Sequence, residues 1–212
     1  MRWPCFYVII YHQNDDVDPN YEGDAMKKLF LIGFMGTGKS AVGRVLAKRQ
    51  GYTCDDLDEL IERSTGTTIA DYISSHGEEA FRDAETKMLT DWIDLHSGTA
   101  EDNEHKYSVL ACGGGVVLRE ENRKMMRANG MSVRLTASIQ SIYQRVSANA
   151  PERPLLISDK PLPERLETLA AVREPLYRET ADIEVSSEGK SAAQTADLIC
   201  QALETPLSQD TP

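Results

Sequence analysis

The sequence predicts an α/β fold in three layers (α/β/α) with a central parallel five-stranded sheet. Short apolar runs alternate along the chain with segments whose apolar residues recur at helical spacing. The runs lack polar alternation, which is typical of parallel strands that helices cover on both faces. Glycines and acidic residues directly follow several of the runs. Ligands of such folds bind beyond the carboxyl ends of the strands, so these residues are candidates for a site.

In the first part of the chain, the wholly apolar run at 29–32 is expected to be the first strand. A glycine-rich turn follows, and a helix is expected over 39–49. One face of that helix carries Val42, Val45, Leu46 and Arg49. Gly51 stands where the helix should end, and 52–55 should form the second strand.

Three helices are expected next. The first covers 58–64, and the second runs from the capping-box pattern at Thr68 to Gly77. The third, over 81–95, is predicted from apolar residues at helical spacing, namely Phe81, Ala84, Met88, Trp92 and Leu95.

Beyond a polar loop at 97–106, strands again alternate with helices. Strands are expected at 108–112, 131–135 and 183–185. Helices are expected at 120–129, 139–146, 163–177 and 192–203. The Pro-rich polar stretch at about 149–161 should be a mobile loop, and 204–212 a frayed tail.

Charge and composition exclude several classes of function. Lys and Arg total 23 against 34 Asp and Glu, a formal net charge of −11, so we expect neither nucleic acid nor an anionic membrane as a partner. No cysteine spacing suggests a metal site, and the longest apolar stretch, 6–11, is too short to span a bilayer. Acidic residues follow that stretch in place of a signal-peptide cleavage site. These features favour a cytoplasmic protein with free thiols.

The first 25 residues differ from the rest of the chain. They hold five acids and one base, and thus −4 of the net charge. Beyond the short apolar run they show no periodicity, so we expect a disordered leader, or a natural start at Met26. The alternative is an additional strand at the edge of the sheet. Residues 26–203 are then expected to form a single domain.

A phosphate-binding loop follows the first strand. The segment Gly33-Phe34-Met35-Gly36-Thr37-Gly38-Lys39-Ser40 matches the pattern G-x-x-x-x-G-K-[ST] between a strand and a helix. Its glycines let backbone N–H groups surround an anion, and the helix N-terminus adds partial positive charge. Lys39 can reach the terminal phosphates, and the Ser40 hydroxyl can bind Mg²⁺. The motif predicts binding of a nucleoside triphosphate.

Three further groups of polar residues or glycines are candidates. The acids Asp55, Asp56 and Asp58 end the second strand and suit Mg²⁺ or general-base chemistry, although acids also stabilise a helix N-terminus. Arg82 could bind an anion, or could simply pair with Glu79 or Glu85 along its helix. Three successive glycines, Gly113, Gly114 and Gly115, are costly in chain entropy and indicate a close backbone approach.

Taken together, these patterns resemble the shikimate kinase family. Six patterns occur in the family's order over residues 26–202. They are the phosphate loop with Val42-Gly43-Arg44, Asp56-x-Asp58-x-x-Ile61-Glu62, Gly77-Glu78-x-x-Phe81-Arg82-x-x-Glu85, Gly113-Gly114-Gly115, Arg153-Pro154-Leu155-Leu156 and Arg173-x-Pro175-x-Tyr177. The resemblance implies a P-loop kinase fold with a mobile lid at about 149–161. It also implies ATP-dependent phosphorylation of shikimate at its 3-hydroxyl.

The resemblance implies roles for individual residues. ATP would be bound by Gly36, Thr37, Gly38, Lys39, Ser40, Ala41, Arg145 and Arg153. Shikimate would be bound by Asp58, Arg82, Gly113, Gly114, Gly115 and Arg173. Asp58, Lys39 and Arg153 would be catalytic, with Arg153 supplied by the lid. Mg²⁺ would bind Ser40 and, through water, Asp56; the extra acid Asp55 leaves open which of the two faces the metal. Arg145 has a second interpretation as a surface charge of its helix.

The family further implies a monomer whose only partners are small molecules. Two other functions stay open at this point. A related kinase of gluconate or of nucleoside monophosphates would share the phosphate loop and lid, and a regulatory module could bind nucleotide without catalysis. A panel of acceptor substrates distinguishes these possibilities from shikimate phosphorylation.

Overall fold

The computed structural model describes residues 8–10, 27–97, 107–147 and 161–204. Its sheet has the strand order β1-β6-β5-β2-β4-β3. The strands are β1 (Val8–Ile10), β2 (Lys27–Ile32), β3 (Thr53–Asp56), β4 (Tyr107–Ala111), β5 (Met131–Thr136) and β6 (Ile183–Ser186). β2 lies between β4 and β5 and runs parallel to both, β3 pairs in parallel with β4, and β6 in parallel with β5. The predicted parallel sheet of five strands is therefore confirmed.

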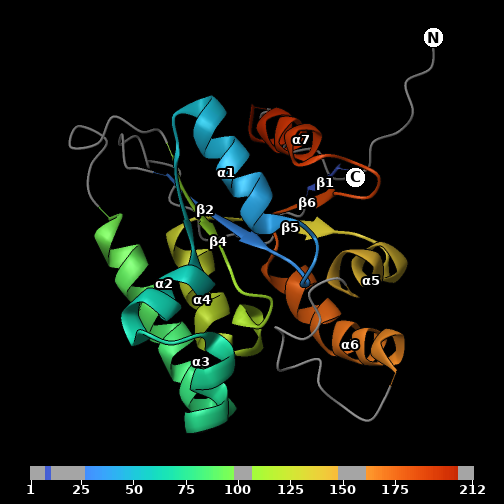
Figure 1. Ribbon diagram of the computed structural model, residues 1–212. Coiled ribbons are helices and arrows are strands. Elements are labelled where there is room, and N and C mark those ends of the chain that lie inside the picture. The colour runs from blue at the N-terminus through green and yellow to red at the C-terminus, as the bar shows by residue number, and fades with distance from the viewer. Residues whose placement is uncertain (1–7, 11–26, 98–106, 148–160, 205–212) are drawn as a thin grey trace.

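Helices cover both faces of this sheet (Figure 1). They are α1 (Lys39–Gln50), α2 (Leu57–Thr65), α3 (Ile69–Leu95), α4 (Glu120–Asn129), α5 (Ile139–Ser147), α6 (Leu162–Thr180) and α7 (Ala192–Glu204). Along β2, Leu29 and Leu31 pack under α1 and α7, whereas Phe30 and Ile32 pack against the helices of the opposite face. Alternate residues of one strand thus belong to two separate cores, which confirms the three-layer architecture.

Two local features add to the prediction. Gly77, expected to end a helix, has the non-helical values φ 86° and ψ 164°, so the two expected helices meet there at a kink within the continuous span of α3. A short 3₁₀ helix, η2 (Val116–Leu118), follows the three glycines and had no signal in the sequence. The remaining elements lie within a few residues of their expected bounds, as is usual for helix and strand ends.

The N-terminal segment contains a strand. β1 pairs antiparallel with β6, with Val8 opposite Val185, which is the edge strand that the sequence left as an alternative. The other residues of 1–25, the expected lid (apart from Pro161 at its end) and the tail after Glu204 lie outside the described residues. In the described part of the chain, no helix combines the length and the hydropathy that a membrane span requires.

Candidate active site

The phosphate loop joins the carboxyl end of β2 to the start of α1. Gly36 and Gly38 have φ values of 76° and 97°, in the left-handed region that glycine tolerates best. The Thr37 hydroxyl donates to the Phe34 carbonyl at 2.7 Å and so braces the turn. α1 begins at Lys39 and has no acidic residue in its first turn, which leaves the positive end of the helix dipole available to an anion.

The Lys39 ammonium lies against the phosphate loop, where it is expected to contact the terminal phosphates. Its Nζ donates to the carbonyl oxygens of Gly33 at 2.8 Å and of Phe34 at 3.1 Å. Only 9% of the residue is exposed, so the charge is held in place at the end of β2. Its positive charge also opposes the rise in the pKa of Asp58, so the two charged groups lie close enough to interact.

Arg145 connects the phosphate loop to the segment after β6. Its guanidinium donates from Nη1 to the Gly36 carbonyl at 3.0 Å and from Nη2 to the Ser187 carbonyl at 3.2 Å. The side chain is exposed, so these contacts are compatible with both interpretations that the sequence offered, and they hold a cation at the edge of the phosphate loop.

The three acids after β3 have different surroundings. Asp56 caps α2, with Oδ1 accepting the N–H of Asp58 at 3.0 Å and of Glu59 at 3.4 Å. Asp55 instead accepts the indole N–H of Trp92 at 2.9 Å and is thus directed to α3. Of the two, Asp56 is the one nearer in the chain to Asp58, and its second carboxylate oxygen has no hydrogen bond within the described residues.

Asp58 lies in an environment that favours its neutral form. Burial raises its pKa to about 6, and the nearby charges of Asp56 and Glu85 add to the rise. A β-carbon on Gly113 would come within 2.6 Å of Asp58 Oδ1, so the carboxylate lies directly against the backbone of the glycine segment. An acid with a raised pKa beside a phosphate loop can hold a substrate hydroxyl and accept its proton.

Arg82 forms a buried ion pair with a residue of its own helix. Nη1 donates to Glu85 at 2.8 Å and Nη2 to Glu78 at 3.0 Å, and the Glu85 side chain is only 1% exposed. Nε of Arg82 and Oε1 of Glu85 are buried without a hydrogen-bond partner among the described residues. A β-carbon on Gly115 would lie 2.2 Å from Arg82 Nη1, so any side chain at this position would displace the guanidinium from where it lies.

Arg173 approaches the same glycine segment from α6. Its Nη1 donates to the Gly114 carbonyl at 3.0 Å, and its guanidinium lies 5.8 Å from the centre of the Phe34 ring. Burial raises the pKa of Glu85, and Arg82 and Arg173 both oppose that rise, so the two cations act on one carboxylate. The structure thus brings Arg82 and Arg173, expected to form a carboxylate clamp, to the two sides of the glycines.

Two residues of the site had no assigned role in the sequence-based prediction, although both stand in the patterns that carried the resemblance. Glu85 pairs with Arg82, a contact that the sequence offered as an alternative on the spacing of three residues. Tyr177 donates to Gly114, a contact for which the sequence holds no signal. Arg153, expected from the lid, lies outside the described residues.

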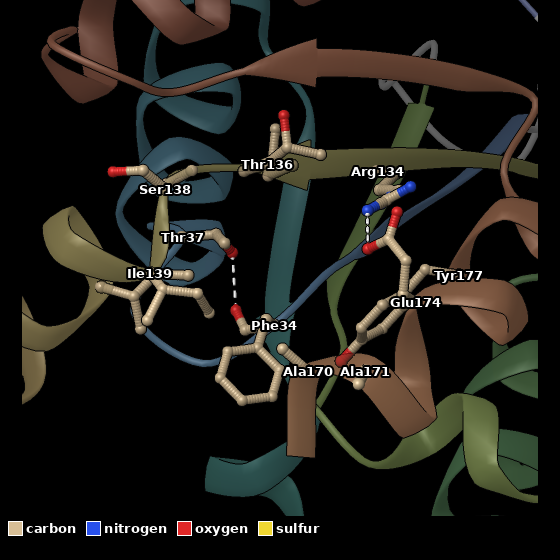
Figure 2. Close-up of a pocket in the computed structure, with 13 residues that line it drawn as sticks. Phe34, Thr37, Arg134, Thr136, Ser138, Ile139, Ala170, Ala171, Glu174 and Tyr177 are labelled. Carbon is tan, nitrogen blue, oxygen red and sulfur yellow. Dashed lines mark hydrogen bonds and ion pairs between the residues drawn. The ribbon is translucent and has the colours of Figure 1, made fainter. Parts of the chain in front are cut away.

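A cavity of about 360 Å³ lies beside the phosphate loop on the side of β5, α5 and α6 (Figure 2). Phe34 and Thr37 line it from the loop, and Arg134, Glu174 and Tyr177 line it from the sheet and α6. Asp58, Arg82, the three glycines and Arg173 are not among its lining residues. We therefore place the candidate site at the glycine segment, where the charged groups meet, and not in this cavity.

Comparison with known proteins gives one consistent family. A family model described as shikimate kinase matches residues 35–204. A shikimate kinase of Thermodesulfovibrio yellowstonii is 40% identical over 179 residues, which is 84% of this chain and 96% of the relative. One of Symbiobacterium thermophilum is 37% identical over 177 residues, or 83% and 95% of the two chains.

Solved structures show the same likeness. The shikimate kinase from Acinetobacter baumannii in complex with shikimate has a TM-score of 0.76 and 32% identity, and covers 85% of this chain and 94% of that one. The shikimate kinase from Aquifex aeolicus has a TM-score of 0.69 and 29% identity, and covers 84% and 96%. All of the expected site residues, from Gly36 to Arg173, lie inside the region that the family model matches.

Proposed function

The chain belongs to the shikimate kinase family, and from this premise we propose that it transfers the terminal phosphoryl group of ATP to the 3-hydroxyl of shikimate. The products are shikimate 3-phosphate and ADP. The observation that carries the proposal is the convergence on three glycines. Asp58, Arg82 and Arg173 reach Gly113, Gly115 and Gly114 respectively, beside the phosphate loop.

Arg82 and Arg173 bind the carboxylate of shikimate in this proposal. Two guanidinium groups at the two sides of the glycines can hold one carboxylate through charge-assisted hydrogen bonds. Asp58 binds the reacting hydroxyl and accepts its proton as the phosphoryl group is transferred. The backbone N–H groups of Gly114 and Gly115 engage no acceptor within the described residues and are available to the substrate.

The nucleotide is bound by the phosphate loop, with Gly36, Thr37, Gly38, Lys39, Ser40 and Ala41 around the phosphates. Arg145 lies at the edge of the loop on the nucleotide side, and Arg153 is proposed to neutralise charge on the transferring group. Catalysis is then mostly positioning and charge neutralisation.

Mg²⁺ fits the residues at this edge of the sheet. No cluster of three or more His, Cys, Asp or Glu forms a metal cage in the described part of the chain. The available donors are hard oxygens, the Ser40 hydroxyl and the Asp56 carboxylate, the latter through water. Such a sparse set suits Mg²⁺, which retains several waters and is held largely by phosphates. When bound, the ion neutralises phosphate charge.

We also propose that the protein acts as a cytoplasmic monomer on small molecules alone. The net charge of −11 opposes binding to polyanions, and the positive groups of the site are local. An ADP-release assay with shikimate, gluconate and a nucleoside monophosphate as acceptors tests the proposed function. ADP release with shikimate supports it, and a preference for either other acceptor contradicts it.

Arg82→Lys is expected to raise the shikimate KM about 10- to 100-fold and to leave the ATP KM within about twofold. Lysine keeps a positive charge beside Glu85 but loses the planar fork that a carboxylate requires. Arg82→Ala is a less clean test, because it also leaves Glu85 buried without its partner and should destabilise the fold. Steady-state kinetics in both substrates provide the measurement. An unchanged shikimate KM and kcat would remove Arg82 from the site.

Arg145→Ala is expected to raise the ATP KM about tenfold while the shikimate KM stays within about twofold, since the substitution removes one charged donor from the nucleotide side. Gln144→Ala, an exposed change one residue earlier on α5, serves as the matched control. An ATP KM equal to that of the control would show that Arg145 is only a surface charge.

A further inference from the structure

The Gly114 carbonyl accepts hydrogen bonds from two side chains of α6. The Tyr177 hydroxyl donates to it at 2.5 Å and Arg173 Nη1 at 3.0 Å. The donors stand one helical turn apart and are 2% and 4% exposed. Both lone pairs of one part-buried carbonyl are thereby used, which is more than an ordinary backbone acceptor requires.

One of these two donors has a competing task. In the proposed function Arg173 binds the substrate carboxylate, a stronger acceptor than a peptide carbonyl. Moving the Arg173 guanidinium to that carboxylate takes a donor away from Gly114. A part-buried carbonyl that loses its last hydrogen-bond partner within the protein carries a penalty that would count against substrate binding.

We propose that Tyr177 is a positioning residue that keeps the Gly114 carbonyl hydrogen-bonded, so that Arg173 can leave it for the carboxylate of the substrate. The inference rests on the proposed function, in which that substrate is shikimate. The same bond has a second consequence. In a trans peptide the Gly114 C=O and the Gly115 N–H point in opposite directions, so holding the oxygen also fixes the direction of the N–H.

The surroundings of Tyr177 suit this role. Burial raises its pKa to about 12, so the phenol remains a donor throughout the pH range of an assay. Arg134 lies 5.8 Å from the ring centre and is itself held by Glu184 at 2.8 Å and Glu174 at 2.5 Å. Figure 2 shows the phenol oxygen directed away from this ion pair. The ring is thus fixed on one side while its hydroxyl reaches the glycine segment.

Tyr177→Phe provides the test, with binding measured by calorimetry. We expect the Kd for shikimate to rise about tenfold and the Kd for ATP to stay within about twofold. A second ligand is the shikimate analogue with a hydroxymethyl group in place of the carboxylate. Its Kd should change by less than about twofold, because an uncharged group does not draw Arg173 away from Gly114.

Thr180→Val is the matched control on the same helix. Thr180 is 1% exposed, and its hydroxyl donates to the Leu176 carbonyl at 2.7 Å, so the control also removes one buried hydrogen bond. It should lower the melting temperature much as Tyr177→Phe does and leave the shikimate Kd unchanged. A similar rise in Kd in both variants would indicate a general loss of stability and would overturn the proposal.

Other outcomes separate the inference from the function on which it rests. An unchanged shikimate Kd in Tyr177→Phe, or an equal loss for shikimate and the uncharged analogue, overturns the role of Tyr177 alone. A wild-type protein that does not bind shikimate overturns the proposed function and the inference with it.

A second measurement needs no substitution. In the NMR spectrum of the labelled wild-type protein, saturation with shikimate should shift the side-chain N–H signals of Arg173 and preserve the slowly exchanging Tyr177 hydroxyl proton. Loss of the hydroxyl signal with unchanged Arg173 signals would overturn the proposal, whether or not the variant folds.

Discussion

Lys39→Ala is expected to lower kcat by about 10²- to 10³-fold, the usual cost of removing one preorganised donor from a site of charge development. The ammonium lies buried at the end of β2, bound to the Gly33 and Phe34 carbonyls at 2.8 and 3.1 Å. Because the ammonium is already buried, it can exchange these acceptors for phosphate oxygens without a further cost of desolvation. The measurement is steady-state ADP release with shikimate as the acceptor.

The fold should tolerate the loss of this side chain. Gly36, Gly38 and the bond from Thr37 to the Phe34 carbonyl shape the loop without the ammonium, so we expect the melting temperature to change by only a few degrees. Lys48→Ala, an exposed change in the last turn of the same helix, controls for the loss of a lysine from α1. A Lys39→Ala protein with more than a tenth of wild-type kcat would contradict the assignment.

The parts of the molecule that the sequence predicted well are those with local causes. The phosphate loop needs glycines at fixed offsets between a strand and a helix, so eight consecutive residues were enough to identify it. The apolar runs predicted five strands because a strand that is buried on both faces has apolar residues at nearly every position. β1 was expected only as an alternative to a disordered leader, because a three-residue edge strand has no such periodicity.

Contacts between distant residues were beyond the sequence alone. Asp55 and Asp56 are adjacent and chemically alike, and the bond that directs Asp55 to α3 comes from Trp92, across 37 positions. The family patterns assigned Arg82 and Arg173 to one substrate, but not the carboxylate of Glu85 on which both act. The second donor on Gly114 was likewise hidden, because Tyr177 and Gly114 are 63 positions apart.

The carboxylates of the candidate site lower the stability of the folded state. Glu85 is compensated by Arg82, but Asp58 has no ion-pair partner among the described residues and lies near both Asp56 and Glu85. A folded protein that holds a carboxylate against burial and like charges loses stability by doing so. The proposed function gives a reason for an acid at this position, because in that proposal the reacting hydroxyl requires a proton acceptor.

Asp58→Asn should therefore have two effects of opposite sign. We expect kcat to fall about 10²- to 10⁴-fold, the range for loss of a general base. At pH 7 we expect the protein to be more stable by about 1–3 kcal/mol, because the neutral amide avoids the cost of an ionised carboxylate whose pKa is raised to about 6. Glu59→Gln, at the next position of α2 and exposed, is the control and should change neither quantity by much.

The sign of the pH dependence follows from the direction of the shift. Because the pKa of Asp58 in the folded protein lies above its ordinary value of 3.8, the folded state binds more protons than the unfolded state between about pH 4 and pH 6. The contribution of Asp58 to stability is thus most favourable below pH 4 and is lost as the pH rises through 6. The stability gain of Asp58→Asn should accordingly be present at pH 7 and vanish near pH 4.

For wild-type protein, kcat/KM for shikimate should fall as the pH drops below about 6, since only the ionised carboxylate accepts the proton. Thermal unfolding at pH 4 and pH 7 tests the pH dependence of stability, and a kinetic pH profile tests the pH dependence of activity. An Asp58→Asn variant that is less stable than wild type at pH 7 would show that the carboxylate is satisfied in the folded protein, and a variant that keeps its activity would show that it is not the base.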